Sequence, residues 1–345
     1  MALKITTDWH IGVKRNAGTT PGSAEKLGAY LHSALHDALF SDLKSAHIIA
    51  GDIFDRFTVD TADLIHTYTT LAKWLDISNE QLVLMRGNHD YQPRGASASS
   101  FDLLTHILSA QFPDQVVVVT EPTEWRQFIF IPHLPNNEIL QLEIDKLRDV
   151  SRRIIIFHAN LDNPWAAESQ NSLNVSMDAA NALVAQGNIV CFGHEHQPRT
   201  LNGGKIIVLG NVVPSSVSDC LGNDTKYHTL VDGLDVTRVP VLNVREVFCE
   251  MDWKELDETP AHMQFVRVTG DCTSNEAAGM ISAVSKLRQK HSAFVITNSV
   301  KIEGIAQMEA LTDLTQESLS RFDVMGALFE DMNEREQTTI KGLLA

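Results

Sequence analysis

Five short motifs in the sequence combine aspartate, asparagine and histidine, side chains that bind divalent metal ions and transfer protons. Each motif directly follows a run of apolar residues typical of a buried β-strand. The motifs are TTDWH (Asp8, His10), GDIFDR (Asp52, Asp55), RGNHD (Asn88, His89, Asp90), IIIFHAN (His158) and CFGHEHQ (His194, His196). Carboxylate and amide oxygens combined with neutral imidazole suit manganese, iron or zinc, whereas calcium favours oxygen ligands alone.

A single motif of this kind is weak evidence, because an isolated Asp-x-His or Gly-Asp is more often a turn or a hydrogen-bonded polar residue. Here five of them follow strands. In an α/β sheet, ligands bind beyond the carboxyl ends of the strands, so we expect the five motifs to converge on one site. The remaining histidines, such as His32 and His106, are expected to be surface or hydrogen-bonded side chains.

The elements that must position these motifs alternate along residues 1–240. Strands are predicted at LKITT, AHIIAG, QLVLM, QVVVVT, QFIFIP, RRIIIFHA, GNIVCFG, GKIIVLG and YHTLVDG. Helices are predicted near residues 23–44, 60–77, 101–110, 136–149 and 178–186. This alternation indicates an α/β fold with a mostly parallel sheet. The later strands are separated by short turns such as NGG and DG, which predicts more antiparallel pairing there.

The character of the sequence changes near Pro240. Residues 245–304 combine strands at REVFCEMDW, HMQFVRVTG and SAFVITNSVKIE with a helix over 274–290, a pattern typical of a small α+β domain. Residues 305–345 are acidic and helical in pattern. We therefore predict a catalytic domain over 1–240, a small domain over 245–304 and a helical tail.

Composition limits the class of protein. Apolar residues make up 43% and charged residues 21% of the chain, which are ordinary globular values. The sequence has no long apolar run and no secretory leader, so we expect a cytoplasmic protein, in the host cytoplasm if its source is viral. Four cysteines without a CxxC pair favour buried thiols. The net charge of -16 disfavours non-specific binding of nucleic acid through the whole surface, although bound metals or a partner's basic groove would supply positive charge.

The motif order D-x-H, G-D-x-x-D, G-N-H-D, H, G-H-x-H resembles the calcineurin-like metallophosphoesterase superfamily over residues 8–196. The resemblance implies a β-sandwich flanked by helices and two divalent metal ions. The first ion would be held by Asp8, His10, Asp52 and His196. The second would be held by Asp52, Asn88, His158 and His194. Asp52 would bridge the pair, which activates water and clamps the phosphate oxygens during in-line displacement.

The resemblance gives His89 a role off the metals, as the general acid that stabilises or protonates the leaving oxygen. Many phosphatases and the bacterial SbcD proteins carry aspartate at the position of Asp55, whereas archaeal and eukaryotic relatives carry histidine. The Asp55 carboxylate would accept a hydrogen bond from His89 and raise the pKa of the proton-donating form. A helix N-cap or a salt bridge to Arg56 is the alternative for Asp55, and Asp90 could simply cap the following turn.

The segments DWHIGVK, IIAGDIFDR and VLMRGNHDY narrow the resemblance to SbcD-type DNA nucleases and to the recombination nuclease subunits of tailed phages. This implies an exonuclease and endonuclease with manganese at both metal positions, or else magnesium, iron or zinc. Residues 245–304 would be its capping domain, and 305–345 the region that docks on an SbcC-type coiled-coil ATPase. The implied partners are DNA, that ATPase and a second copy in a homodimer, with no membrane.

Two further sets of residues are candidates for contacts. Basic residues near the motifs could bind phosphates of an entering strand, although scattered basic residues are usually only solvated. They are Lys14, Arg15, Arg56 and Arg94. An apolar helical face in the tail is either core packing or a surface for the ATPase. It is formed by Phe322, Met325, Leu328 and Phe329.

Two other functions remain open. The same metal chemistry would serve a phosphodiesterase or phosphatase that acts on nucleotides, cyclic nucleotides or phosphoproteins, and the net charge of -16 favours this slightly. The residues beyond the catalytic domain count against it, because a small-molecule esterase does not need them. A non-catalytic scaffold would require broken ligands, yet every expected ligand position holds a suitable residue type.

Overall fold

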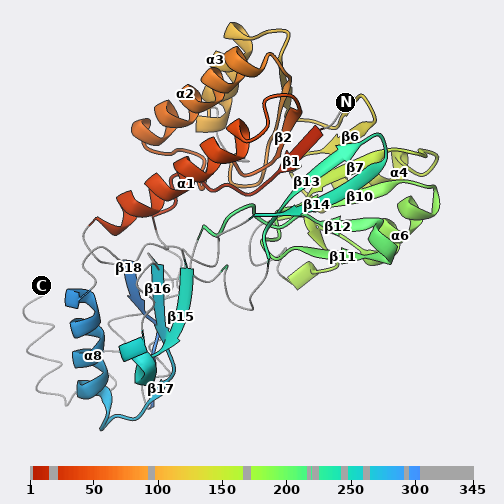
Figure 1. The fold of residues 1–345 in the computed structure, drawn as a ribbon. Helices are drawn as coiled ribbons and strands as arrows, with labels where there is room; N and C mark the ends of the chain where they lie inside the picture. The colour runs from red at the N-terminus through yellow and green to blue at the C-terminus, as the bar shows by residue number, and fades with distance from the viewer. Residues whose placement is uncertain are drawn as a thin grey trace, which may run out of the picture.

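The computed structural model describes residues 3–14, 22–91, 98–165, 172–215, 219, 225–241, 248–258, 265–290 and 295–303. Within them, two large sheets and a smaller C-terminal sheet are each accompanied by helices (Figure 1). The predicted α/β fold is confirmed. None of the described helices combines the length and the apolar character that a bilayer span requires.

The first sheet has six strands in the order β14-β13-β1-β2-β3-β4. Strands β1 to β4 are parallel to one another, and the β13–β14 hairpin pairs antiparallel with β1. The strands are β1 Leu3–Thr6, β2 Ala46–Ala50, β3 Leu82–Met85, β4 Val116–Val119, β13 Tyr227–Asp232 and β14 Asp235–Pro240. Only β14 lies outside the predicted strands, because its polar residues interrupt the apolar pattern.

The second sheet also has six strands, in the order β11-β12-β10-β7-β6-β5. Its four central strands are parallel, and the short edge strands β5 and β11 are antiparallel. The strands are β5 Thr123–Trp125, β6 Phe128–Ile131, β7 Ile154–His158, β10 Ile189–Gly193, β11 Arg199–Leu201 and β12 Ile206–Val208. A small pair, β8 Asn160–Leu161 with β9 Asn174–Val175, follows the end of β7.

The two sheets pack face to face and form a sandwich with helices on both outer faces (Figure 1). Ile48 of β2 and Ile156 of β7 belong to the same buried core between the sheets. Three helices cover the first sheet, α1 Ser23–Phe40, α2 Thr61–Ser78 and α3 Ser100–Gln111. Two helices cover the second, α4 Asn137–Lys146 and α6 Met177–Ala185. Because both faces of each sheet are covered, β2 and β7 are buried along their whole length and are mostly apolar.

Helix starts agree with local capping chemistry. Ser99 accepts a hydrogen bond from the Asp102 backbone, and the Asp102 side chain accepts one from the Ser99 backbone, so α3 begins with a reciprocal capping box. Asn136 and Ser176 cap α4 and α6 in the simpler way. These caps fix where each helix starts relative to the strand before it.

The C-terminal unit is a three-stranded parallel sheet, β15 Phe248–Asp252, β16 Phe265–Thr269 and β18 Val295–Asn298. Helix α8 (Ala277–Lys290) covers it, and β17 Asp271–Cys272 pairs with β19 Lys301–Ile302. The unit contacts α1, where the rings of Tyr30 and Phe265 lie 5.9 Å apart. Cys191 and Cys272 are buried free thiols. The predicted tail 305–345 and its apolar residues Phe322, Met325, Leu328 and Phe329 lie outside the described residues.

Candidate metal centre

The five motifs meet at one edge of the sandwich. Those after β1, β2 and β3 come from the first sheet, and those at the ends of β7 and β10 come from the second. Three groups of side chains there bring possible ligand atoms within 4.8 Å of one another. The groups are Asp8–His10–His196, His10–Asp52–His89 and Asp52–His158–His194. All seven residues predicted as ligands therefore lie in one cluster, in which Asn88 contacts His158 and His194.

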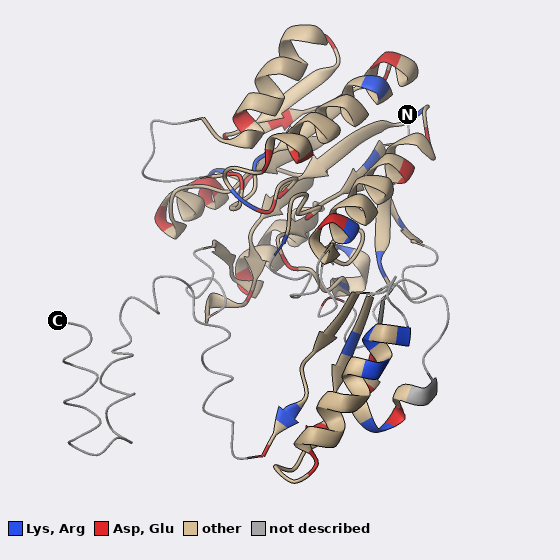
Figure 2. Ribbon diagram, turned by 90° about the vertical axis from the view of Figure 1, so that its left-hand side faces the viewer, with Lys and Arg blue, Asp and Glu red and all other residues tan. Residues whose placement is uncertain are grey.

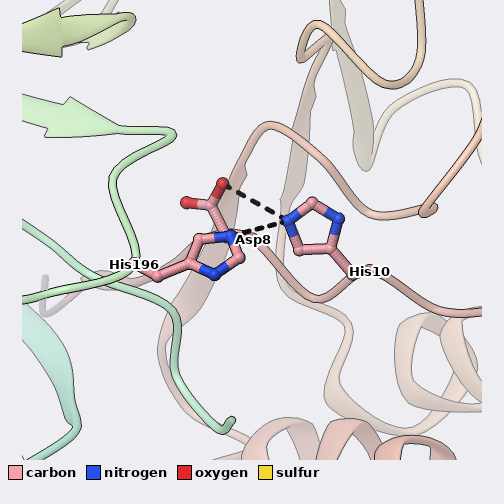
Figure 3. A group of neighbouring side chains, drawn as sticks. All are labelled: Asp8, His10 and His196. Atoms are coloured by element: carbon pink, nitrogen blue, oxygen red, sulfur yellow. Dashed lines mark hydrogen bonds and ion pairs between the residues drawn. The ribbon is translucent and has the colours of Figure 1, made fainter. Parts of the chain in front are cut away.

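The first group joins the loop after β1 to the loop after β10 (Figure 3). Nε2 of His10 lies 2.9 Å from Nε2 of His196 and 3.9 Å from Oδ1 of Asp8. The two imidazole nitrogens thus face each other beside a carboxylate. Such convergence of nitrogen and oxygen donors is the arrangement that binds a divalent cation.

The second predicted ligand set consists of Asp52, Asn88, His158 and His194, and is called the second group below. It joins the ends of β2, β3, β7 and β10. Nε2 of His158 lies 3.2 Å from Oδ2 of Asp52. The amide oxygen of Asn88 lies 3.1 Å from Nε2 of His158 and 2.9 Å from Nδ1 of His194. Carboxylate, amide oxygen and two imidazoles therefore share one small space, as expected from the motif pattern.

Asp52 lies between the two groups. Its Oδ1 accepts a hydrogen bond of 3.0 Å from the backbone N–H of His89. Its Oδ2 faces His158 and lies 4.0 Å from Nε2 of His10 in the first group. One oxygen is thus held by the backbone while the other is directed between the groups, which is the position a bridging carboxylate requires.

The donor set fits a metal pair. Oδ2 of Asp8 accepts hydrogen bonds from Thr7 and from the backbone of His194. Its Oδ1 is buried and makes no hydrogen bond to any described residue. Asp8 and Asp52 are both fully buried, at 0% exposure. Buried carboxylates are costly unless a cation compensates them, so the chemistry of this pocket favours bound divalent ions.

The backbone at these loops adopts a conformation that few side chains tolerate. Asp8, His10, Asp52 and His194 have φ angles of 54°, 47°, 50° and 87°, in the left-handed region. Strain of this kind is typical of functional sites, where the surrounding fold over-determines the loop. The four residues therefore owe their positions to the sheets on either side rather than to local preference.

Two glycines make room for the cluster. A Cβ atom at Gly51 would collide with the ring of His158, and one at Gly87 would collide with the Asp52 carboxylate. Gly51 also has a φ of 101°, which disfavours other residues. The glycines in the G-D and G-N-H-D motifs are therefore required by the close approach of neighbouring ligands.

Two histidine rings are fixed by bonds on the side away from the cluster. Nδ1 of His158 lies 3.0 Å from the backbone oxygen of Ala50. Nδ1 of His196 lies 3.0 Å from Oδ1 of Asp219. Each Nδ1–H donates to these oxygens, so the lone pair of Nε2 faces the site, as second-shell bonds of metal-binding histidines do. Asp219 is a site residue that the sequence reasoning missed, because it follows no strand motif.

Burial and the charge of Asp52 shift the pKa values in the second group. Burial alone would lower the pKa of His158, but Asp52 raises it to about 9. Burial and the charge of His158 lower the pKa of His194 to about 4. Burial raises the pKa of Asp52, yet the charges of His158 and His89 hold it well below its ordinary value. Without a metal ion the His158 ring therefore carries a second proton, on Nε2 beside Asp52, which would be lost when a cation binds there.

The predicted contact between the carboxylate of Asp55 and His89 is wrong. Nδ1 of His89 lies 2.6 Å from the backbone oxygen of Asp55, which accepts its hydrogen bond. The Asp55 carboxylate instead lies 3.5 Å from Nδ1 of His10 and 3.7 Å from Nε of Arg56. The loop after β2 turns its carbonyl toward His89 and its side chain toward the D-x-H loop, so the salt-bridge alternative to Arg56 is the one observed.

Asp90 does more than cap a turn. Its Oδ2 accepts hydrogen bonds from the backbone of Gly87 in its own turn and from the backbone of Asp52. Burial, together with the nearby charge of Asp52, raises the pKa of Asp90 to about 7. Asp90 thus ties the G-N-H-D loop to the G-D loop.

The candidate phosphate contacts are less well supported. Lys14 forms an exposed ion pair with Asp60, and Arg56 pairs with Asp55. Both basic groups are therefore already paired with carboxylates, although Arg56 keeps 55% of its side chain exposed. Arg15 and Arg94 lie outside the described residues.

Comparison with known proteins agrees with this geometry. No curated protein matches the chain in sequence. One solved structure of similar fold is a dimetal phosphatase from Danio rerio, 12% identical, covering 70% of this chain and 95% of that one, with a TM-score of 0.36. That likeness is too weak to support an inference. Residues 1–198, however, match the family model described as calcineurin-like phosphoesterase, and they include every predicted metal ligand. The chain therefore belongs to the calcineurin-like phosphoesterase family.

Proposed function

We propose that this phosphoester hydrolase is a two-metal phosphodiesterase that cleaves DNA, the SbcD-type nuclease subunit of a complex with an SbcC-type ATPase. The observation that supports the metal chemistry is the position of Asp52, whose Oδ2 faces His158 of one ligand group and lies 4.0 Å from His10 of the other, with His89 beside them. Manganese is the metal we propose for both positions, because the ligand set mixes imidazole with carboxylate and amide oxygen.

The bound metals would supply an activated water and positive charge for the phosphate oxygens. The protein's own residues prepare the site for this. Asp52 holds the two ligand groups together, and the backbone bond from His89 fixes the carboxylate in place. The bond from Nδ1 of His89 to the Asp55 carbonyl orients the ring, so its protonated form donates from Nε2 to the leaving oxygen. That is the geometry of a general acid.

DNA as the substrate rests on two features. The segments DWHIGVK, IIAGDIFDR and VLMRGNHDY are similar to those of SbcD-type nucleases. In addition, the C-terminal unit packs on α1, the helix that follows the D-x-H loop. Figure 2 marks Lys and Arg positions along α8 of this unit, whose last turn carries Arg288 and Lys290. Such groups supply the phosphate contacts that an otherwise acidic protein needs.

The ATPase and a second copy of the chain are the proposed protein partners. Residues 305–345, with their apolar positions, are the segment we assign to the ATPase. Exonuclease and endonuclease action then depend on how the ATPase presents DNA ends and loops to the metal site. The small unit at 245–304 is proposed to act as the capping domain of the nuclease.

The test uses the full chain, freed of metal with a chelator and reconstituted with manganese, on end-labelled duplex and single-stranded DNA. We expect cleavage that needs manganese and increases when the ATPase is added. His89→Gln should lower turnover by roughly 10²- to 10⁴-fold while the manganese content stays unchanged. His106→Gln, an exposed position on α3, is the matched control. Intact DNA in the presence of both manganese and the ATPase would overturn the proposal.

A second candidate is a phosphodiesterase or phosphatase for nucleotides or other small phosphoesters. The net charge of -16 favours it, because it disfavours a polyanionic substrate. Hydrolysis of bis-p-nitrophenyl phosphate or of a nucleotide, with no cleavage of DNA under the same conditions, would support this candidate.

A further inference from the structure

We infer that Asp219 is a positioning residue that sets the metal affinity of one half of the site, the group Asp8–His10–His196, and leaves the other half unaffected. The inference rests on the proposed two-metal function and adds to it, because it assigns different second-shell control to the two metal positions. It concerns the segment between β12 and β13, LGNVVPSSVSD, which resembles the closing segment of the family's catalytic domain but in which Asp219 was not predicted as a site residue.

Asp219 is held by several donors at once. Its Oδ2 accepts hydrogen bonds of 3.0 Å from the side-chain amide of Asn211, and of 2.9 Å from both the backbone N–H and the hydroxyl of Ser215. Its Oδ1 is then left facing Nδ1 of His196 at 3.0 Å. The donors around Oδ2 fix the carboxylate, so its direction toward His196 is set before any metal binds.

The backbone of His196 is held from the same side. The ammonium group of Lys226, which is only 1% exposed, donates a 2.9 Å hydrogen bond to the carbonyl oxygen of His196. The backbone N–H of Asn211 also donates to that oxygen, at 3.3 Å. Both the ring and the main chain of His196 are therefore fixed by hydrogen bonds with one set of residues. We call this set the clamp; it consists of Asn211, Ser215, Asp219 and Lys226.

The clamp directs the Asp219 carboxylate at the His196 ring, because Oδ2 accepts from Asn211 and Ser215 while Oδ1 lies 3.0 Å from Nδ1. An ionised carboxylate on Nδ1 makes the imidazole a stronger donor at Nε2 and fixes its tautomer. Nε2 of His196 is the atom that faces His10 in Figure 3.

The other half of the site is built differently. Nδ1 of His158 donates to the neutral backbone oxygen of Ala50, which belongs to β2 and cannot be removed by changing a side chain. Nδ1 of His196 thus faces a carboxylate, whereas Nδ1 of His158 faces a backbone carbonyl. Loss of Asp219 should therefore act on one position only.

The clamp also lies outside the part of the chain that matches the family model. That match ends at residue 198, whereas the clamp residues lie between positions 211 and 226. The predicted ligands thus lie within the matched residues, and the side chains that hold His196 in place lie in the segment that follows them.

The experiment measures manganese binding to the full chain by calorimetric titration and by metal analysis after equilibrium dialysis. We expect the wild-type chain to bind two equivalents. Asp219→Asn should keep one equivalent at wild-type affinity and weaken the other by roughly 10- to 100-fold. Spectra of the bound manganese should change from a coupled pair to a single ion at limiting metal. Asp235→Asn, an exposed carboxylate on β14, is the matched control and should bind as wild type does.

A second variant, Ser215→Ala, tests the same contact with less risk of misfolding. In Ser215→Ala the Asp219 carboxylate loses the hydroxyl donor but keeps the backbone donor, so the same position should weaken less than in Asp219→Asn. Equal weakening of both equivalents, or no weakening in either variant, would overturn the inference. The readout is independent of substrate: a chain that binds two equivalents but cleaves no DNA contradicts the proposed nuclease, whereas a nuclease whose variants bind metal normally contradicts only the role of Asp219.

Discussion

At the scale of single residues, the types and order of the metal-binding side chains were predictable, whereas their hydrogen-bond partners were not. The family resemblance assigned Asp52 as the shared carboxylate, and Asp52 lies between the two groups. The acceptor for His89 is a backbone oxygen, and no sequence pattern distinguishes a carbonyl from the carboxylate of the same residue. Asp219 was not predicted because a lone aspartate in a turn resembles ordinary surface.

The position of the Asp55 carboxylate changes what its replacement should do. Because it lies 3.5 Å from Nδ1 of His10 and the bond to His89 comes from the backbone, Asp55→Asn should weaken metal binding at the first group. It should leave the pH dependence of turnover, measured at saturating manganese, unchanged. The check is a manganese titration beside a pH–rate profile. A shifted acidic or basic limb in that profile would contradict this prediction and would support a contact between the Asp55 carboxylate and His89.

His133 should make stability depend on pH. Its ring is 4% exposed, and burial lowers its pKa from 6.5 to about 3. Below pH 6.5 His133 is protonated in the unfolded chain but stays neutral in the folded chain. The free energy of unfolding is therefore highest above that pH and decreases as the pH falls toward 3. The loss amounts to about 1 kcal/mol between about pH 7.5 and about pH 5.5.

The measurement is denaturant unfolding of the full chain at those two pH values. In His133→Gln the change in stability between them should shrink by about 1 kcal/mol, whatever the absolute stability of the variant. His36→Gln removes an exposed histidine of α1 and should leave the change as it is in wild type. An unchanged pH dependence in His133→Gln would show that His133 does not carry it.

At the scale of elements, the strands and helices of the sandwich follow from apolar periodicity, but their partition into two sheets does not. β3 and β7 have the same apolar pattern and lie in different sheets. Sheet membership depends on which helices cover which face, and that is decided by packing over long sequence separations. The edge strands β5, β11 and β14 were missed because an edge strand needs little apolar surface.

Helices α2 and α3, which pack side by side, expose large apolar residues that a single copy of the chain leaves uncovered. They are Ile65 (58%) and Ile77 (51%) on α2, with Leu103 (45%) and Ile107 (39%) on α3. We propose that the chain forms a homodimer and that Ile65 and Leu103 take part in its contact, because exposed apolar side chains are typical of permanent interfaces. Ile65→Lys combined with Leu103→Lys should convert the dimer to a monomer in light scattering.

The control for this pair is Leu142→Lys on α4. Leu142 is as exposed as Ile65, at 61%, but lies over the other sheet. It should leave the dimer intact. A dimer that survives the double substitution, or a wild-type chain that is already monomeric, would place the contact elsewhere or remove it.

At the scale of the whole molecule, both sheets contribute candidate ligands to the same metal centre. Asp8, Asp52 and Asn88 come from the first sheet, whereas His158 and His194 come from the second. Bound metals would therefore tie together two layers that otherwise meet through apolar packing. Without them, Asp8 is fully buried with an Oδ1 that makes no hydrogen bond to any described residue, and Asp52 is compensated by the protonated ring of His158.

Removal of metal should accordingly destabilise the whole sandwich. Ions that bind only the folded chain stabilise it by about 2.7 kcal/mol for each site when present at roughly 100 times the dissociation constant. Calorimetric unfolding of the full chain with manganese and after chelation should show a lower transition temperature without metal. Asp52→Asn, which removes the shared ligand, should unfold at nearly the same temperature in both conditions. If chelation lowered the transition of Asp52→Asn as much as that of wild type, the stabilising ions would have to bind away from the sheet junction.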